Sequence, residues 1–549
     1  MSGAGLKGQA PDARGGAGTP KEIGKEGTMR MRISLMLLAF CLALTSSHAA
    51  MAQTPLKGGT FVFGRGADSV GLDPAVVTDG ESFRVTRNIY DSLLEYKRDS
   101  TEVIPGLAER WETSPDGLKW KFVLRRNVKF HDGTPLTAEA VVFNFERWMF
   151  ESHPYHKGVF EYWKSMFGGF PGFVKSVKAI DDASVEFVLE KPMAPFLANL
   201  AMPMFGIASP TAIKKYGDDY FKNPIGTGPF RFKEWRRDDR IVLERHPDYW
   251  GEKALLDRVI FRSIIDNSAR LLELQAGSID LMEFLSPDDL PTVKNDPNLQ
   301  LILRPSMNVG YLWWNVEKEP FGTLEVRRAI AQAINKRAIV ERLFGGIGIP
   351  AKNMLPPSVW GYNDAVVDYE YDPAKARESL AKAGLPNGFK TKLWAMPNPR
   401  PYMPQPTKIA EAIQADLKAV GIDAEIVTMD WATYLAKTRD GEQEMYMLGW
   451  TGDNGDPDNF LYWFFGQKET RSRYFNAKAA EFTAKAQAVF EQEERARLYR
   501  EAQVVLKEDA ANVPIAHTTP PLAAKKIVKG YIPHATGGEK LDTVWLEKK

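Results

Sequence analysis

The sequence lacks the features of several protein classes. It has one cysteine, Cys41, among 549 residues, so no disulfide scaffold can form within the chain. Lysine and arginine total 71 against 70 for aspartate and glutamate, and the formal net charge is +1. Nucleic-acid binding usually needs a basic excess that displaces counterions from phosphates. We therefore expect no nucleic-acid partner.

A hydrophobic run of membrane-spanning length is also missing. The apolar run of residues 35–44 is too short to span a bilayer, which takes about 20 residues. It follows the basic pair Arg30 and Arg32 and precedes Ala50-Met51-Ala52, whose small residues suit signal peptidase. We predict a signal peptide that is cleaved before Gln53.

Residues 1–52 are thus expected to be an N-terminal extension and signal peptide that are removed. The alternatives are a short hydrophobic anchor and a lipoprotein acylated at Cys41, which the bulky Phe40 before it disfavours. The sequence leaves open whether translation starts at Met1 or Met29. An exported mature chain without cysteine is typical of the bacterial periplasm.

Catalytic signature motifs are absent from the expected mature chain as well. Residues 53–549 contain no HExxH, GxSxG, GxxxxGK[ST] or GxGxxG, and a mature chain without Cys41 has no thiol nucleophile. His153 and His156 could pair on a metal, but Pro154 lies between them and no acidic cluster is near, which favours a surface loop. The sequence predicts neither an enzyme, nor a metal, nor a cofactor.

Three segments in the first half alternate apolar and polar residues with the period of a strand. One of them directly follows the turn signal Pro115-Asp116-Gly117. We predict half-buried antiparallel strands whose buried faces carry Trp120, Phe122 and Leu124, then Val185, Phe187 and Leu189, then Ile241 and Leu243.

The second half shows the spacing of amphipathic helices. Segment 326–344 repeats apolar residues every three or four positions, and segment 407–420 ends at Gly421, a typical C-cap residue. Residues 422–430 then have the pattern of a strand. This strand–helix–strand order predicts a parallel sheet with crossover helices within residues 306–516.

Two changes of pattern suggest where the domains meet. Hairpins give way to crossover units near Ser306, and strand-like residues return after His517. We expect an α/β protein in which residues 53–305 and 517–549 form lobe I and residues 306–516 form lobe II. Two connections that cross between the lobes would make a hinge beside a ligand cleft.

Residues 394–406, WAMPNPRPYMPQP, contain five prolines around Arg400. Proline fixes φ and removes a hydrogen-bond donor, so we predict a stiff loop that is neither helix nor regular strand. Arg400 could meet a surface carboxylate, or it could be held ready for a ligand. Composition alone does not choose between these interpretations.

Residues 449–460, GWTGDNGDPDNF, place Asp453, Asp456 and Asp458 among glycines and asparagines. A calcium loop of the EF-hand type would need a closing glutamate, and Pro457 interrupts the ligand spacing. A plain turn with solvated aspartates remains possible, as does a carboxylate aimed at a ligand cation from a backbone that can approach closely.

The chain from about Gly58 to its C-terminus resembles the family 5 extracellular solute-binding proteins of ABC transporters. Residues 63–74 resemble the family in general, whereas the two loops with Arg400 and Asp453 resemble its dipeptide-binding branch. The segments that carry the resemblance, in the family's order, are 104–146, 223–232, 271–282, 308–316, 326–344, 393–404 and 449–460.

The resemblance implies a two-lobed periplasmic-binding-protein fold of type II, in the large peptide-binding class, with a two-segment hinge and the ligand cleft between the lobes. It also implies that Asp453 binds the α-ammonium of a peptide and Arg400 its α-carboxylate. The other residues expected in the site are Trp450, Thr451, Gly452 and Tyr402.

The expected function is that of the periplasmic substrate-binding component of an ABC importer. A monomer would bind dipeptides or short peptides and deliver them to an inner-membrane permease with cytoplasmic ATPase subunits. Uptake of haem, glutathione, an opine or a nickel chelate by the same fold is the alternative. A periplasmic peptidase is more remote, because it would need a catalytic motif that the sequence lacks.

Overall fold

The fold is taken from a computed structural model that describes residues 55–468 and 470–548. The predicted signal peptide with Cys41 and the cleavage site before Gln53 lie outside these residues. Within the described ranges, no helix combines the length and the apolar character that a membrane crossing requires.

A seven-stranded mixed sheet forms the centre of the first part of the protein. Strand β1 (Thr60–Arg65) lies between two strands that run parallel to it, and all other neighbouring strands of the sheet pair antiparallel. The strands, in spatial order, are β12 (Leu299–Leu303), β19 (Pro521–Lys525), β11 (Leu281–Met282), β1 (Thr60–Arg65), β10 (Arg258–Ser263), β9 (Arg240–Arg245) and β8 (Phe230–Arg236).

A six-stranded mixed sheet forms the centre of the second part. Its strands, in spatial order, are β14 (Gly348–Pro350), β18 (Val513–Thr518), β13 (Asn308–Trp314), β17 (Met445–Thr451), β15 (Phe389–Trp394) and β16 (Ile422–Val427). β15 runs parallel to both β16 and β17, whereas β13 runs antiparallel to β17 and β18. The predicted strand–helix–strand unit is therefore present as β15, α12 (Pro406–Lys418) and β16.

Smaller sheets and fifteen labelled helices complete the described residues. The antiparallel four-stranded sheet consists of β4 (Ala108–Thr113), β5 (Lys119–Leu124), β7 (Ser184–Leu189) and β6 (Val174–Asp181), and the two-stranded sheets of β2 (Leu94–Tyr96) with β3 (Val103–Pro105) and β20 (Val528–Lys529) with β21 (Trp545–Leu546). The helices are α2 (Gly80–Thr86), α3 (Ala138–Met149), α4 (Glu161–Phe167), α5 (Phe196–Leu200), α6 (Pro210–Tyr216), α7 (Asn267–Ala276), α8 (Leu290–Asn295), α9 (Leu324–Ala333), α10 (Lys336–Leu343), α11 (Pro373–Lys382), α12 (Pro406–Lys418), α13 (Trp431–Asp440), α14 (Asp458–Phe465), α15 (Ala477–Ala488) and α16 (Gln492–Glu508).

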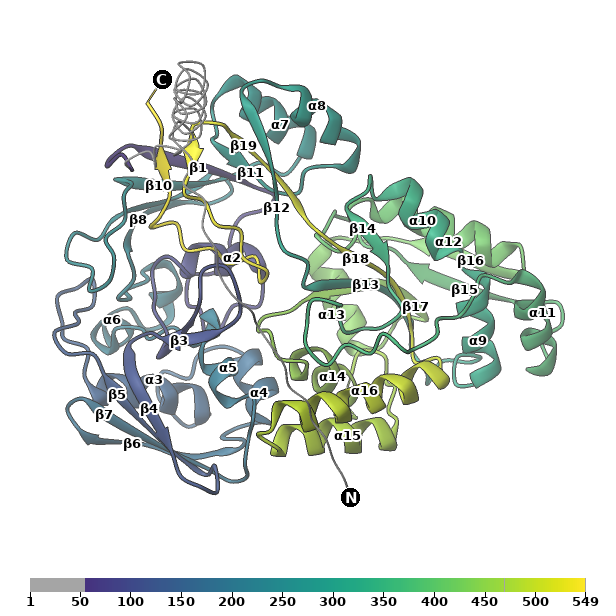
Figure 1. Cartoon of the computed structure of the whole chain (residues 1–549), viewed down its shortest axis with the longest axis horizontal. Coiled ribbons are helices and arrows are strands. Elements are labelled where there is room, and N and C mark those ends of the chain that lie inside the picture. The colour runs from purple at the N-terminus through teal and green to yellow at the C-terminus, as the bar shows by residue number, and fades with distance from the viewer. Residues whose placement is uncertain (1–54, 469, 549) are drawn as a thin grey trace, which may run out of the picture. The chain divides into compact units, whose positions relative to one another are not determined.

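The chain passes between the two large sheets twice. It leaves the seven-stranded sheet after Leu303 and enters the six-stranded sheet at Asn308, then returns between Thr518 and Pro521 (Figure 1). The two connections are tied together because the backbone N–H of Arg304 donates to the carbonyl of Pro520 over 2.9 Å. We call the part around the seven- and four-stranded sheets lobe I and the part around the six-stranded sheet lobe II.

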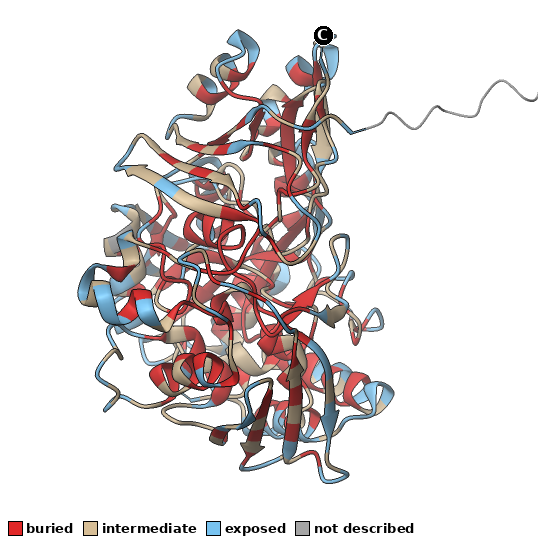
Figure 2. Cartoon of the chain, turned by 90° about the vertical axis from the view of Figure 1, so that its left-hand side faces the viewer, coloured by how far each residue is buried: buried red, intermediate tan, exposed pale blue. Residues whose placement is uncertain are grey.

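The strands predicted from alternation are confirmed. The apolar faces expected on β5, β7 and β9 are all buried, and buried residues fill the interior between sheets and helices (Figure 2). In β5 and β7 these side chains pack in one cluster, in which the rings of Phe122 and Phe187 meet edge to face at 5.3 Å between centroids. Burial of one face is what the period-two pattern encodes.

The helix predicted over 326–344 is two helices, α9 and α10. The break lies at Ile334 and Asn335, and the Asn335 side chain accepts a hydrogen bond from the Ala338 backbone N–H at 3.1 Å as the N-cap of α10. Asparagine competes for backbone groups in this way, so it starts a new helix where the apolar spacing continues. α12 also ends earlier than predicted, at Lys418, and Gly421 follows with φ +94°.

Candidate functional site

The two loops of interest begin at the same edge of the six-stranded sheet. The proline-rich loop follows β15 and the aspartate loop follows β17, and these strands are parallel neighbours. β13, which begins directly after the first connection from lobe I, is antiparallel to β17 and starts at this same edge. Ligands of open α/β sheets bind outside the carboxyl ends of parallel strands where the strand order changes.

The proline-rich loop is shorter than predicted, because Trp394 closes β15 and Pro406 opens α12. Between them, Arg400 and Met403 exchange two backbone hydrogen bonds of 3.1 and 2.9 Å that close a tight turn. The loop is anchored to the second connection because the Thr518 hydroxyl donates to the Pro401 carbonyl at 2.7 Å. Arg400 thus projects from a loop fixed at both ends.

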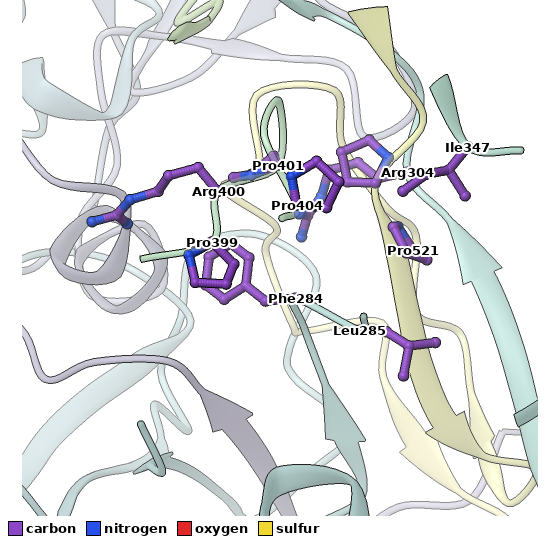
Figure 3. A pocket seen from close by; sticks show the side chains of 10 residues that line it. Phe284, Leu285, Arg304, Ile347, Pro399, Arg400, Pro401, Pro404 and Pro521 are labelled. Carbon is purple, nitrogen blue, oxygen red and sulfur yellow. The ribbon is translucent and has the colours of Figure 1, made fainter. Parts of the chain in front are cut away.

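The Arg400 guanidinium lies over the Trp431 ring, 4.3 Å from its centroid. Its Nε is buried without a hydrogen-bond partner in the described part of the chain, and no carboxylate there forms an ion pair with it. Arg400 also borders a small cavity, which Phe284 of lobe I and three prolines of the loop line. Its side chain extends away from the Arg304 and Pro521 side of that cavity (Figure 3).

The three aspartates of the second loop have different surroundings. Asp456 accepts two hydrogen bonds of 2.7 Å from the Arg495 guanidinium, so its charge is paired inside the protein. Asp458 accepts from Gln487 at 3.1 Å and from Tyr499 at 3.2 Å. Both are buried in lobe II, and neither matches the solvated aspartates of a plain turn.

Asp453 has no cationic partner among the described residues. Its Oδ1 accepts a hydrogen bond of 3.2 Å from the Tyr162 hydroxyl of lobe I, and the Asn459 amide lies 3.5 Å from its Oδ2. Both donors are neutral, and burial raises the pKa of the Asp453 carboxyl to about 7. A carboxylate in these surroundings would be strongly stabilised by a cationic group brought by a ligand.

The two aromatic residues expected in the site differ in exposure. Trp450 is half-buried, donates its indole N–H to Asn459 Oδ1 at 3.0 Å and lies against the Trp463 ring at 5.1 Å between centroids. Tyr402 is buried against β17, where a Cβ added to Gly449 would overlap its ring, and burial raises the pKa of its hydroxyl to about 12. Tyr402 therefore packs on the sheet, next to the loop position of Arg400.

Thr451 and Gly452 connect the sheet to Asp453. Thr451 is the last residue of β17 and pairs with Asn308, and the Gly452 N–H donates to the Met307 carbonyl of the first connection at 2.9 Å. A Cβ on Gly452 would lie 2.7 Å from the Phe460 ring. Close packing beside the hinge therefore requires glycine here.

Sequence reasoning missed the residues of lobe I that meet the aspartate loop. Tyr162 contacts Asp453 and Asn199 contacts Asn454, although each pair is separated by more than 250 residues in the chain. No spacing or composition signal connects positions so distant. A long-range contact of this kind becomes visible only when the two lobes are folded together.

The two histidines considered above have contacts with other residues of lobe I. His156 Nδ1 is hydrogen-bonded to the Arg147 carbonyl at 2.8 Å, and His153 packs its ring on Phe143. In the described ranges, no three histidine, cysteine, aspartate or glutamate side chains gather as metal ligands would.

Comparison with known proteins places this architecture in one family. Residues 102–472 match the model of the bacterial extracellular solute-binding proteins, family 5. The chain is 40% identical to the dipeptide-binding protein of Escherichia coli K12 over 94% of its length and 100% of the relative's, and 38% identical to heme-binding protein A of Haemophilus influenzae over 95% and 100%.

The solved structures agree with this assignment. A periplasmic binding protein of Helicobacter pylori, associated with an ABC transporter and solved with the peptide STSA, is 38% identical and superposes with a TM-score of 0.84 over 90% of this chain and 99% of its own. The two sheets, the double connection and these similarities together show that the chain belongs to the family 5 bacterial extracellular solute-binding proteins, with their two-lobed α/β fold.

Proposed function

We propose that this protein binds dipeptides and other short peptides in the periplasm and delivers them, as a monomer, to the inner-membrane permease of an ABC importer with cytoplasmic ATPase subunits. The observation that carries the proposal is the pair of unmatched charges on neighbouring loops of lobe II. Asp453 has only neutral donors, and Arg400 has no carboxylate partner in the described ranges.

The two charges fit the two ends of a zwitterion. Taking a peptide out of water costs several kcal/mol per terminal charge unless each is paired, so a closing cleft needs an anion for the ammonium and a cation for the carboxylate. We assign Asp453 to the α-ammonium and Arg400 to the α-carboxylate, because a guanidinium can bind a carboxylate through two parallel hydrogen bonds. Trp450 and Tyr402 would border the peptide, with the backbone of Thr451 and Gly452 beside it.

The fixed positions of these charges would select peptide length. One more residue lengthens an extended peptide by roughly 3.5 Å, too much for both terminal charges to keep partners on anchored loops. We further propose that lobe I comprises residues 53–305 and 517–549 and lobe II residues 306–516. The sheet boundaries at Leu303, Asn308, Thr518 and Pro521 support these limits.

Native mass spectrometry with a mixture of dipeptides, tripeptides and haem tests the proposal directly. We expect intact dipeptides to be retained, and thermal melting to shift upward with added dipeptide. Ligand at a hundredfold excess over Kd adds about 2.7 kcal/mol to the free energy of unfolding. Retention of haem or another solute alone, with no dipeptide effect on melting, would contradict the proposal, and released amino acids would indicate a peptidase.

Dipeptide affinity should also fall as the pH falls below 7. Asp453 must be ionised to pair with an ammonium, and burial raises its pKa to about 7. Below pH 7 the carboxyl is therefore protonated in the free protein, and its deprotonation on binding costs part of the binding free energy. The α-ammonium, with a pKa of about 8, stays charged there. We expect the affinity to drop by up to about tenfold per pH unit below 7, measured by isothermal titration calorimetry.

Two conservative variants provide the controls for this pH profile. Asp453→Asn should bind more weakly and lose the pH dependence, since the titrating group is gone. Asp458→Asn should keep it, although burial raises the pKa of Asp458 to about 7 as well. An unchanged slope in Asp453→Asn would show that another group controls the affinity.

A further inference from the structure

Three consecutive residues of the aspartate loop contact lobe I. Asp453 accepts a hydrogen bond from Tyr162 of α4, and the Asn454 side-chain amide donates to the Asn199 Oδ1 of α5 at 2.9 Å. Gly455 packs against Thr101, in the turn between β2 and β3. The helices that approach each other in this region are α4 and α5 of lobe I and α14 and α15 of lobe II (Figure 1).

The contact between Asn454 and Asn199 is completely enclosed. The two side chains are 0% and 1% exposed, and the Asn454 Oδ1 is used within its own loop, where it accepts from the Asp456 N–H at 3.0 Å. A buried amide that loses its partner bears its full desolvation cost, whereas lobes that separate return both amides to water. This hydrogen bond therefore depends on the lobes being together.

Gly455 allows the backbone of lobe II to approach lobe I without a side chain between them. A Cβ built on Gly455 would overlap the Thr101 hydroxyl oxygen and lie 2.7 Å from the Thr101 Cβ. Glycine is thus required by the space between the lobes, because its own backbone is not in the left-handed region. Any larger residue would act as a wedge between the lobes.

Other contacts between the two lobes lie outside this loop. The Ala194 N–H of lobe I donates to the Gln487 carbonyl of α15 at 2.7 Å. The Phe490 ring, between α15 and α16, lies 6.3 Å from the Trp120 ring of β5. These contacts also join lobe I to lobe II, but their residues are farther along the chain from Asp453.

We propose that Asn199 and Thr101 of lobe I, with Asn454 and Gly455 of lobe II, form a lock between the lobes that sets how tightly the closed protein holds any ligand. The inference rests on the proposed function, because it assumes that ligand binds between the lobes beside Asp453. The four residues are positioning residues. They act on ligand affinity through the closed arrangement of the lobes.

Such a lock makes a distinctive thermodynamic prediction. If ligand is held by the closed form, weakening the lock lowers the population of that form and lowers the apparent affinity for every ligand by the same factor. Loss of Asp453 itself would instead matter only for ligands with an α-ammonium. The ratio of affinities for a free dipeptide and its N-acetylated form therefore separates the two roles.

Asn199→Ala tests the lock without touching the ligand. We expect its Kd values for Ala-Ala and N-acetyl-Ala-Ala to rise by about tenfold each, with their ratio unchanged and the increase mainly in the dissociation rate. Asn353→Ala is the matched control, because Asn353 is equally buried but donates to Asn363 within lobe II. It should lower the melting temperature and leave both affinities at the parent's values.

The contact between Gly455 and Thr101 permits a rescue experiment. Gly455→Ala should weaken binding of both ligands and make the liganded protein more extended in small-angle scattering. Adding Thr101→Gly in the opposite lobe removes the overlapping atoms, and we expect it to restore most of the lost affinity. A general defect of folding in Gly455→Ala would not be repaired by a change in the other lobe.

The outcomes that overturn the lock differ from those that overturn peptide binding. Parent-like Kd values in both Asn199→Ala and Gly455→Ala would contradict the lock, as would a double variant no better than Gly455→Ala. If the parent retains no dipeptide, the proposed function fails instead. The same variants are then measured with the solute that native mass spectrometry recovers from the parent.

Discussion

Asp453→Ala is expected to weaken the binding of free dipeptides by roughly thirtyfold or more. Truncating one partner of a desolvated charge pair typically costs about 2–5 kcal/mol, and each 1.4 kcal/mol corresponds to a tenfold change in Kd. The large effect is expected because no other cation-binding carboxylate takes over, since Asp456 is paired with Arg495 and Asp458 is bonded to Gln487 and Tyr499. Titration calorimetry against Ala-Ala measures the change.

N-acetylation of the ligand provides the internal control for Asp453. An N-acetyl dipeptide should bind the parent poorly, yet it should lose much less affinity on Asp453→Ala, because the charge that the carboxylate serves is already missing. A misfolded variant would lose both ligands alike. If Asp453→Ala bound free dipeptides as tightly as the parent, the assignment of the ammonium to this residue would be wrong.

Arg400→Ala should produce a loss of similar size at the other end of the peptide, about 2–5 kcal/mol in binding free energy. The guanidinium is held by its contact with Trp431, so little side-chain freedom remains to be lost when a carboxylate binds. Arg400→Lys should be intermediate, since an ammonium keeps the charge but cannot form two parallel hydrogen bonds.

A C-terminally amidated dipeptide isolates the contribution of Arg400. It should bind the parent weakly and be nearly insensitive to Arg400→Ala, whereas its response to Asp453→Ala should remain large. Equal losses of the free and the amidated peptide on Arg400→Ala would point to a structural role of the loop. Surface plasmon resonance with the two ligands on each variant gives the four comparisons.

Local pattern was sufficient for much of the fold. The buried faces of β5, β7 and β9 follow from period-two alternation, and the unit of β15, α12 and β16 follows from an apolar stripe between two strands. The break between α9 and α10 did not follow, because the apolar spacing runs on through Asn335 while its side chain caps a new helix. Helix capping depends on one side-chain hydrogen bond, which the spacing of apolar residues does not reveal.

The candidate site could be predicted only in part for a related reason. The sequence places Asp453, Asp456 and Asp458 in one loop but cannot tell which is unpaired, because the partner of Asp456 is Arg495, 39 residues further along the chain. The resemblance pointed to Asp453, and the pairing of the others gives that choice a physical basis. Asn199 and Thr101 carry no local signal at all, since their importance arises from contact between lobes.

The return of the chain to lobe I has a consequence for how the molecule can be assembled. β19 lies between β11 and the edge strand β12, so β12 cannot join the other five strands of the seven-stranded sheet until residues 521–525 are available to pair with both. During synthesis, strands made early must wait for almost the whole chain, and pairings of such long sequence separation form slowly. The seven-stranded sheet should therefore be completed only when translation is nearly finished. A chain truncated before Pro521 would expose two unpaired strand edges, which favour aggregation.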